Sequence, residues 1–161
     1  MNLISGVIVK NLIVHQDISD TEEQLGKPGY LMEVLRDDDE LLRKFGQTTF
    51  TIAFKNTIKA FHWHKKQDDL WFIATGKAVV VLHDIRDVSD TKGVTQIINA
   101  GKDDYKLILI PDGVVHGYKV LSDEPVILFY HTTESYNPDN PDEERIAWND
   151  PQIDFDWDSV S

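Results

Sequence analysis

Three histidines in two separate segments are the residues of this chain best suited to chemistry. His62 and His64 lie in residues 58–76, and His116 lies in residues 109–118. Each segment joins strand-like sequence to a glycine turn. If the two strands lie side by side, the three imidazoles face one cavity. They could then hold a metal ion or supply a base that titrates near neutral pH, and the function depends on which.

Length and composition are typical of a globular protein. A chain of 161 residues, with 41% hydrophobic residues and four tryptophans, is expected to fold as a single domain over residues 1–161. The net charge of −12 argues against binding to nucleic acid, which requires a basic face. A compact phosphorylated ligand needs only a few local cations and stays compatible with this charge. The absence of cysteine excludes disulfides and thiolate metal sites.

The sequence contains no candidate for a membrane span. No apolar run approaches eighteen residues, the length that a spanning helix requires. Residues 1–15 have apolar character but lack a basic region and a small-residue cleavage site, so they are interpreted as a first strand and not as a signal peptide. We therefore expect a soluble, cytoplasmic protein.

Short apolar runs, rich in β-branched and aromatic residues, recur along the chain and are bounded by Gly, Pro, Asn or Asp. This pattern predicts an all-β sandwich or barrel. Residues 48–54 alternate as expected for a strand with one buried face. The predicted strands cover residues 6–14, 30–35, 48–54, 60–64, 70–74, 78–82, 95–98, 106–110, 118–120 and 126–131.

Helix signals are weak. Residues 37–45 could form a short helix, with Asp37 or Asp38 as N-cap and acidic residues in the first turn. After Ser135 the chain is acidic and contains three prolines, which predicts an irregular arm anchored by Trp148 and Trp157. Its charge is expected to form a solvated surface.

The histidine segments resemble the two motifs of the cupin superfamily, whose fold is a jelly roll, or double-stranded β-helix. The first reads His62-x-His64-x4-Asp69-x6-Gly76, and the second reads Pro111-x-Gly113-x2-His116. Metal-binding cupins normally carry glutamate where Asp69 stands, but aspartate can also bind a divalent ion. The resemblance therefore implies a cupin-type fold and leaves a metal site at His62, His64, Asp69 and His116 as one reading.

A second resemblance is more extensive. From Gly26 to Trp157 the chain is similar to the dTDP-4-dehydrorhamnose 3,5-epimerase family, which is itself cupin-like. Pieces of the family pattern occur in order over four-fifths of the chain. They include Lys59-Ala60-Phe61-His62-Trp63, Ile110-Pro111-x-Gly113-x-x-His116-Gly117-Tyr118 and Ile146-x-Trp148-Asn149-Asp150-Pro151, together with residues 29–33, Gln47, 83–91, 128–130 and 135–138.

The resemblance implies an isomerase that acts on a nucleotide-diphospho-4-keto-6-deoxy sugar, with no metal or redox cofactor. A base removes a proton beside the carbonyl, at C3 or C5, and an acid returns one to the opposite face of the enolate. His62 is implied as the base and Tyr130 as the acid. The family also implies a homodimer. The implied substrate-binding residues are Gln47, Lys59, His116 and Tyr136.

Several positions depart from the family pattern. A lysine that can stabilise the enolate oxygen is replaced by Asp69, and Lys65 is a candidate to supply the missing cation. An arginine for the diphosphate is replaced by Lys59, which keeps the charge but loses the bidentate fork. A second phosphate arginine is absent from residues 26–29. The family aspartate that pairs with the catalytic histidine is also missing, and Asp84 is a plausible substitute from a neighbouring strand.

These departures suggest a divergent branch with a different nucleotide sugar, epimerised at C3, C5 or both. Two alternatives remain open. One is a metal-dependent cupin isomerase or oxygenase, which Asp69 favours. The other is a sugar-nucleotide-binding protein that has lost the chemistry, which the missing lysine and aspartate motivate.

Overall fold

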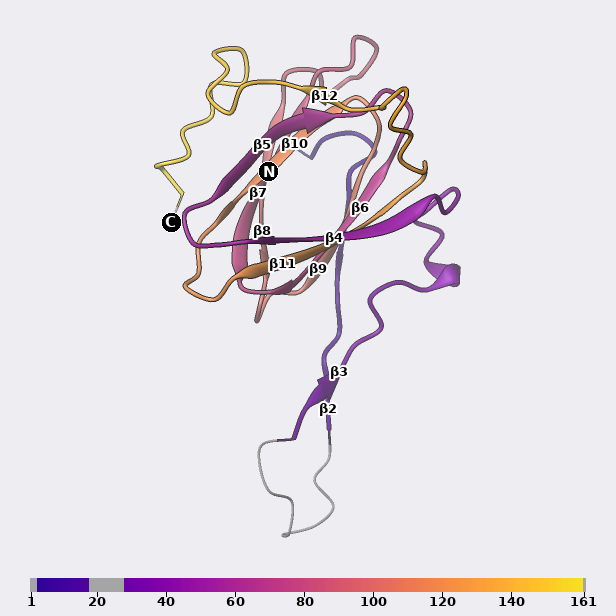
Figure 1. Cartoon of the computed structure of the whole chain (residues 1–161), viewed down its shortest axis with the longest axis vertical. Coiled ribbons are helices and arrows are strands. Elements are labelled where there is room, and N and C mark those ends of the chain that lie inside the picture. Colours follow the sequence, from indigo (N-terminus) through magenta and orange to yellow (C-terminus); the bar gives the residue numbers. More distant parts are fainter. Residues whose placement is uncertain (1–2, 18–27, 161) are drawn as a thin grey trace.

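The computed structural model describes residues 3–17 and 28–160, and its core consists of two five-stranded sheets (Figure 1). One sheet has the order β1-β9-β6-β11-β4 and the other β12-β5-β10-β7-β8, and all their pairings are antiparallel. The all-β jelly-roll prediction is confirmed. The strands are β1 (Ile8–Asn11), β2 (His15–Gln16), β3 (Tyr30–Leu31), β4 (Gln47–Ala53), β5 (Ile58–Trp63), β6 (Asp69–Thr75), β7 (Lys77–Asp84), β8 (Thr95–Gly101), β9 (Lys106–Ile110), β10 (Val114–Val120), β11 (Val126–Thr132) and β12 (Glu144–Arg145).

The main core lies between the two sheets. Trp71 and Leu128 reach it from one sheet, and Val80, Leu82 and Tyr118 reach it from the other. The strands β6 and β7 are buried along most of their length, which matches their nearly continuous apolar sequence. Burial of these side chains is the main force that holds the two sheets face to face.

Strand β4 forms where residues 48–54 predicted it, but its apolar face points outward. Phe50 and Ile52 are exposed, whereas the alternate residues Thr49 and Thr51 are half-buried. Thr51 lines a cavity between the sheets. The inner face of β4 is therefore polar because it borders a cavity and not the dry core.

The N-terminal strands are shorter than the sequence predicted. Only Ile8–Asn11 of residues 6–14 pairs with β9, and only Tyr30–Leu31 of residues 30–35 is a strand. The strands β2 and β3 form a separate two-stranded ribbon that extends away from the two sheets (Figure 1). Residues 1–2 and 18–27, which include part of the early family pattern at Gly26, lie outside the described residues.

The prediction of a helix over residues 37–45 is wrong. Only a single 3-10 turn, η1 (Asp37–Asp39), forms there, and it ends at Glu40 with a left-handed φ of 53°. Leu41 and Leu42 then pack against the apolar cluster of β6 and β9. A helix would require Glu40 to keep a right-handed backbone, so it would turn these leucines away from their present contacts.

The C-terminal arm is mostly irregular, as predicted, and it closes against β5 through β12. Trp157 is buried and packs on Phe61, with ring centroids 5.3 Å apart. Its Nε1 donates a hydrogen bond to the carbonyl of Trp148 at 2.9 Å. The prediction that the Trp148 side chain also anchors the arm is wrong, because that ring is 53% exposed. The second anchor is the buried Ile153.

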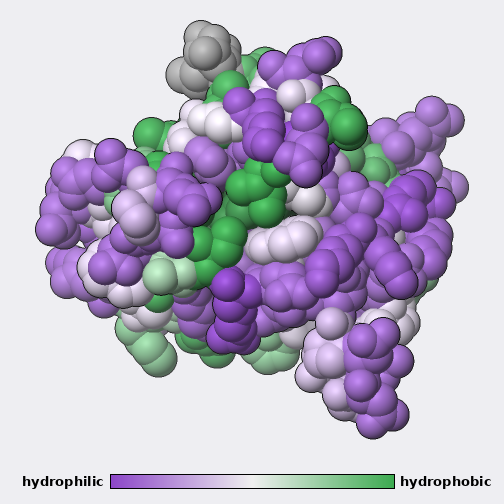
Figure 2. All heavy atoms as spheres, turned by 90° about the horizontal axis from the view of Figure 1, so that it is seen from above, coloured by the Kyte–Doolittle hydropathy of each residue, from purple (hydrophilic) through white to green (hydrophobic). Residues whose placement is uncertain are grey.

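None of the helices in residues 3–17 and 28–160 has the length and apolar character needed to cross a membrane. Seen from above, the surface is mostly hydrophilic, and a narrow hydrophobic band crosses it beside a hollow (Figure 2).

Candidate active site

A bulge in β5 places two functional residues on the same side of the sheet. His62 pairs with His116 of β10 and Lys59 pairs with Tyr118, although the register shifts between these pairs. Lys59 and His62 are three residues apart, whereas their partners are two apart. The extra residue in β5 restores the alternation, so both side chains face the interior. Both line the same cavity.

This first cavity, of about 430 Å³, lies between the sheets. His62 and Lys59 reach it from β5, and Tyr130 reaches it from β11 of the opposite sheet. Arg145, which sequence reasoning missed, reaches it from the edge strand β12, where it pairs with His62 in register. The other lining residues are Thr51, Ile58, Ala60, Phe61, Asp69, Trp71, Tyr118, Leu128, Glu143 and Ile146.

A second cavity, also of about 430 Å³, adjoins the first because His62, Asp69, Tyr130 and Glu143 line both. It contains three of the remaining predicted site residues, Gln47, Lys65 and Tyr136. The structure therefore brings all the predicted catalytic and substrate-binding residues except His116 and Asp84 to the walls of two adjoining cavities.

His116 lies directly behind His62. The centroids of these two rings are 4.2 Å apart, and His64 completes the cluster, with its ring centroid 5.8 Å from that of His62. One ring nitrogen from each of the three histidines lies within 4.8 Å of the other two. The three imidazoles converge as the sequence suggested, but only His62 and His64 line the second cavity, and His116 is buried behind them.

Asp69 is buried beside the histidine cluster. Its carboxylate accepts hydrogen bonds from Gln67 Nε2 at 2.7 Å and Trp71 Nε1 at 3.1 Å. His116 Nε2 and His64 Nε2 lie 3.6 and 3.7 Å from its oxygens. Burial raises the pKa of Asp69. The interaction with His116 and the charges of both histidines lower it by more, so the net pKa lies below the usual range. The group is therefore a buried anion at neutral pH.

The environment of His62 favours its neutral form. Burial lowers the pKa of His62, the positive charge that His116 could carry lowers it again, and Asp69 opposes both with a smaller effect. The imidazole is consequently uncharged at neutral pH and has a lone pair available to accept a proton. In contrast, burial raises the pKa of Tyr130, so its phenol keeps its proton at neutral pH.

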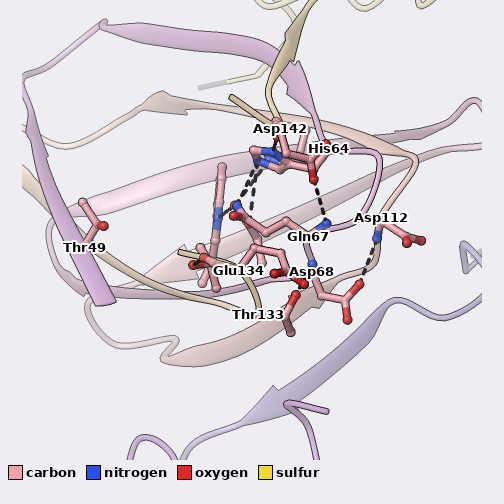
Figure 3. A network of polar contacts seen from close by, with 12 residues as sticks. Thr49, His64, Gln67, Asp68, Asp112, Thr133, Glu134 and Asp142 are labelled. Carbon is pink, nitrogen blue, oxygen red and sulfur yellow. Dashed lines mark hydrogen bonds and ion pairs between the residues drawn. The ribbon is translucent and has the colours of Figure 1, made fainter. Parts of the chain in front are cut away.

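Asp142, which lines the second cavity, ties the C-terminal arm to the loop that follows β5 (Figure 3). Its carboxylate accepts hydrogen bonds from the backbone N–H groups of Lys65, Lys66 and Gln67 at 2.9, 2.9 and 3.1 Å. Its carbonyl oxygen accepts a hydrogen bond from His64 Nδ1. Sequence reasoning missed this residue because it treated the acids of the arm as a solvated surface.

The cations near the cavities have different surroundings. Lys59 Nζ donates to Thr51 Oγ1 at 2.6 Å and to the carbonyl of Ile52 at 3.2 Å. Lys65 is paired with Glu144 at the surface, so it does not point freely into the second cavity. Arg145 is paired with Glu143 at 2.7 Å and is largely exposed, at the edge of the first cavity.

Gln47 and Tyr136, which both line the second cavity, are joined by a hydrogen bond. Gln47 Oε1 accepts from the backbone N–H of Tyr136 at 2.8 Å. The ring of Tyr136 is exposed. An exposed ring beside a cavity is suited to stacking on a planar ligand group.

The expectation that Asp84 pairs with His62 is wrong. Asp84 is fully buried, and its carboxylate accepts hydrogen bonds from Arg86 Nε at 2.9 Å, Ser89 Oγ at 2.6 Å and Thr91 Oγ1 at 2.7 Å. These partners lie on the loop that follows β7, so the carboxylate is used to hold that loop. The carboxylate of Asp69, in contrast, lies 3.6 Å from His116 Nε2 and 3.7 Å from His64 Nε2.

Known proteins resemble this chain over nearly its whole length. Residues 23–161 match the family model described as dTDP-4-dehydrorhamnose 3,5-epimerase. The spore coat polysaccharide biosynthesis protein SpsL of Bacillus subtilis is 49% identical over 155 residues, which cover 96% of this chain and 97% of SpsL. The probable low-salt glycan biosynthesis epimerase Agl13 of Haloferax volcanii is 30% identical over 143 residues, which cover 88% of this chain and 92% of Agl13.

The fold is also found among solved structures. A dTDP sugar isomerase from Desulfovibrio desulfuricans superimposes with a TM-score of 0.82 at 25% sequence identity. The superposition covers 98% of this chain and 94% of that one.

Proposed function

The chain belongs to the dTDP-4-dehydrorhamnose 3,5-epimerase family, and from this premise we propose that it epimerises a nucleotide-diphospho-4-keto-6-deoxy sugar at C3, C5 or both. The family relationship makes the chain an isomerase of sugar nucleotides. The nature of the sugar, and the roles of the individual residues, belong to the proposal.

One observation carries the proposed mechanism. His62 lines the first cavity from β5 of one sheet, and Tyr130 lines it from β11 of the other. A sugar ring between the sheets would have the imidazole on one face and the phenol on the other. Inversion at a carbon requires that a proton leave from one face and return to the opposite face, and this arrangement allows it.

The proposed reaction starts at a C–H bond beside the 4-keto group. His62 accepts the proton, and the electron pair of the C–H bond passes to the carbonyl oxygen to give an enolate. As the carbonyl re-forms, the carbon takes a proton from the hydroxyl of Tyr130 on the opposite face. Proton exchange with solvent then returns the imidazolium and the phenolate to their starting forms. No electrons are gained or lost overall.

The remaining residues supply binding interactions. Lys59 and Arg145 are cations at the first cavity and would attract the diphosphate, which compensates for the acidic character of the whole chain. His116 would support the sugar end behind His62. Gln47 and Tyr136 of the second cavity would contact the nucleoside end, whereas Lys65 would first have to leave Glu144. We also propose a homodimer, which the family resemblance implies.

The test is proton exchange with solvent. Candidate 4-keto-6-deoxy nucleotide sugars are incubated with the protein in D2O and followed by NMR. We expect deuterium to enter at C3, C5 or both, and His62→Asn to abolish it, while the surface variant His15→Asn exchanges like the wild type. Undiminished exchange in His62→Asn would refute the role of His62. Tight binding of every sugar tested, without exchange, would favour a non-catalytic binding protein.

A metal-dependent cupin enzyme is the second candidate, because the ring nitrogens of three histidines converge. The two functions differ in their response to chelation. Protein treated with EDTA and then freed of it should keep its full exchange rate under the first proposal. Loss of exchange that is restored by a divalent metal would favour the second.

A further inference from the structure

We propose that His62, His64 and His116 form a binding site for a transition-metal ion such as Zn²⁺, and that a metal in this site and a substrate undergoing epimerisation exclude each other. The metal site is independent of the proposed function. The exclusion also rests on the proposed role of His62 as the base.

The hydrogen bonds of two histidines leave their Nε2 lone pairs free for a ligand. His116 Nδ1 lies 2.9 Å from the carbonyl of Val114, and His64 Nδ1 contacts the carbonyl of Asp142. A carbonyl oxygen only accepts, so each Nδ1 must carry the proton and each neutral ring must have a lone pair on Nε2. Metal-binding histidines are typically held in this way, with the second ring nitrogen bonded to a carbonyl or carboxylate.

The surroundings of these Nε2 atoms leave room for a metal bond. His116 Nε2 is buried and has no hydrogen-bond partner among the described residues. Such an atom is costly unless something binds to it. His64 Nε2 has the amide nitrogen of Gln67 at 3.3 Å, a donor that a metal could replace, and an oxygen of Asp69 at 3.7 Å.

His62 supplies the third nitrogen. One ring nitrogen of each histidine lies within 4.8 Å of one in each of the other two, whereas a tetrahedral Zn²⁺ with bonds of about 2.0–2.1 Å holds its ligands roughly 3.4 Å apart. Small movements of the rings would bring the nitrogens to this separation. Three protein ligands leave one position for water or another small ligand.

The charge of the site also suits a divalent metal. Imidazoles bind a metal in their neutral form and so bring no charge, and the buried carboxylate of Asp69 lies 3.6–3.7 Å from two of them. Asp69 is outside the group of three converging ligands, and its oxygens are bonded to Gln67 and Trp71. It therefore acts as a neighbouring negative charge. A set of three nitrogens favours Zn²⁺, Cu²⁺ or Ni²⁺ over Mg²⁺ or Ca²⁺, which prefer oxygen.

The exclusion follows from the shared lone pair. A His62 nitrogen that is bonded to a metal has no lone pair with which to accept a proton from the sugar. The metal would also occupy space at the wall that His62 contributes to both cavities. Zinc should therefore inhibit epimerisation, and substrate should weaken zinc binding.

The site is tested first by binding, without any sugar. Zn²⁺ is titrated by calorimetry into chelator-treated protein, and Co²⁺ is used as a probe because its visible spectrum reports tetrahedral coordination. We expect about one Zn²⁺ per chain, and an affinity lowered at least about tenfold in His64→Gln and His64→Ala but unchanged in His15→Gln. No binding by the wild type, or equal binding by the His64 variants, would overturn the site.

The exclusion is tested by solvent exchange. Zinc should stop exchange in the wild type, EDTA should restore it, and the His64 variants should need at least about tenfold more zinc for the same inhibition. Full exchange by the zinc-loaded wild type would refute the exclusion while leaving the site intact. If no sugar exchanges in any protein, the proposed function fails, and calorimetry still decides the metal site.

Discussion

Gly117 of β10 lies against Ala60 of β5 so closely that a β-carbon on Gly117 would be 2.4 Å from the β-carbon of Ala60. It would also be 2.8 Å from the Ala60 α-carbon and 2.9 Å from the carbonyl oxygen of Lys59. This contact lies within the bulged segment that places Lys59 and His62 on the cavity side. The absence of a side chain at position 117 therefore helps to fix the base and its neighbour His116.

The Gly117→Ala variant should be destabilised and slow. The added methyl group must push β5 away from β10, which costs about 1–3 kcal/mol in the free energy of unfolding and displaces His62. Urea denaturation measures the first effect and the exchange assay the second. The double variant Ala60→Gly, Gly117→Ala removes the closest contact and should recover part of the stability. A wild-type unfolding midpoint for Gly117→Ala would show that the two strands separate easily.

Removing the hydroxyl of Tyr130, the proposed acid, should slow inversion without stopping proton removal by His62. In Tyr130→Phe the imidazole of His62 is unchanged, so it should still remove a proton and return deuterium to the same face. Inversion should slow by at least about 100-fold, because no group on the opposite face supplies a proton. NMR in D2O measures both rates in one sample. Tyr105→Phe, in a hydroxyl pair with Tyr30 outside both cavities, serves as control. Equal loss of exchange and inversion would contradict separate roles.

The sheets and the meeting of the histidines could be predicted from sequence because both depend on local patterns. The apolar runs at residues 78–82 and 126–131 became β7 and β11 with small extensions. His62 and His116 face each other because their strands pair, as the two motifs suggested. Period-two alternation also predicted β4, but it could not show that the threonine face of this strand points to the cavity and the apolar face to solvent.

Other features depend on contacts between distant residues, for which the sequence has no local signal. The carboxylate of Asp142 caps the backbone of residues 65–67, yet in sequence it is one acid among many in the arm. The position of its strand predicts Asp84 in the site, but its carboxylate instead accepts a hydrogen bond from Arg86, two residues away. The orientation of Lys59 depends on a bulge that strand propensity does not reveal.

Loss of the charge of Lys59 should weaken substrate binding more than turnover. Lys59 lines the first cavity, where its ammonium group could contact a diphosphate. Because a charge-assisted contact contributes substantially to the free energy of binding, Lys59→Ala should raise Kd for a nucleoside diphosphate about tenfold. Lys59→Arg keeps the charge and should retain most of the affinity. Lys55→Ala removes a surface lysine paired with Asp123 and is the matched control. Calorimetry at two salt concentrations measures these effects, and equal affinities for both alanine variants would place the diphosphate elsewhere.

The lowered pKa of His62 predicts how stability changes with pH. In the unfolded chain the ring titrates near 6.5, whereas in the folded protein burial, and then His116, keep it neutral to much lower pH. As the pH falls below 6.5, the unfolded state therefore takes up a proton that the folded state does not. The contribution of His62 to stability is fully present above pH 6.5 and is lost as the pH falls toward the folded pKa. The expected slope from this one group is up to about 1.4 kcal/mol per pH unit.

The variant His62→Gln isolates this effect. Burial also lowers the pKa values of His83 and His131, so the wild type and the variant share that background. The free energy of unfolding, measured by urea denaturation from about pH 5 to pH 7, should fall less steeply with acid in His62→Gln. Asp69, whose pKa is lowered from 3.8, titrates below this range in both proteins. Parallel pH profiles for the two proteins would mean that His62 is more accessible to solvent than its place between the sheets implies.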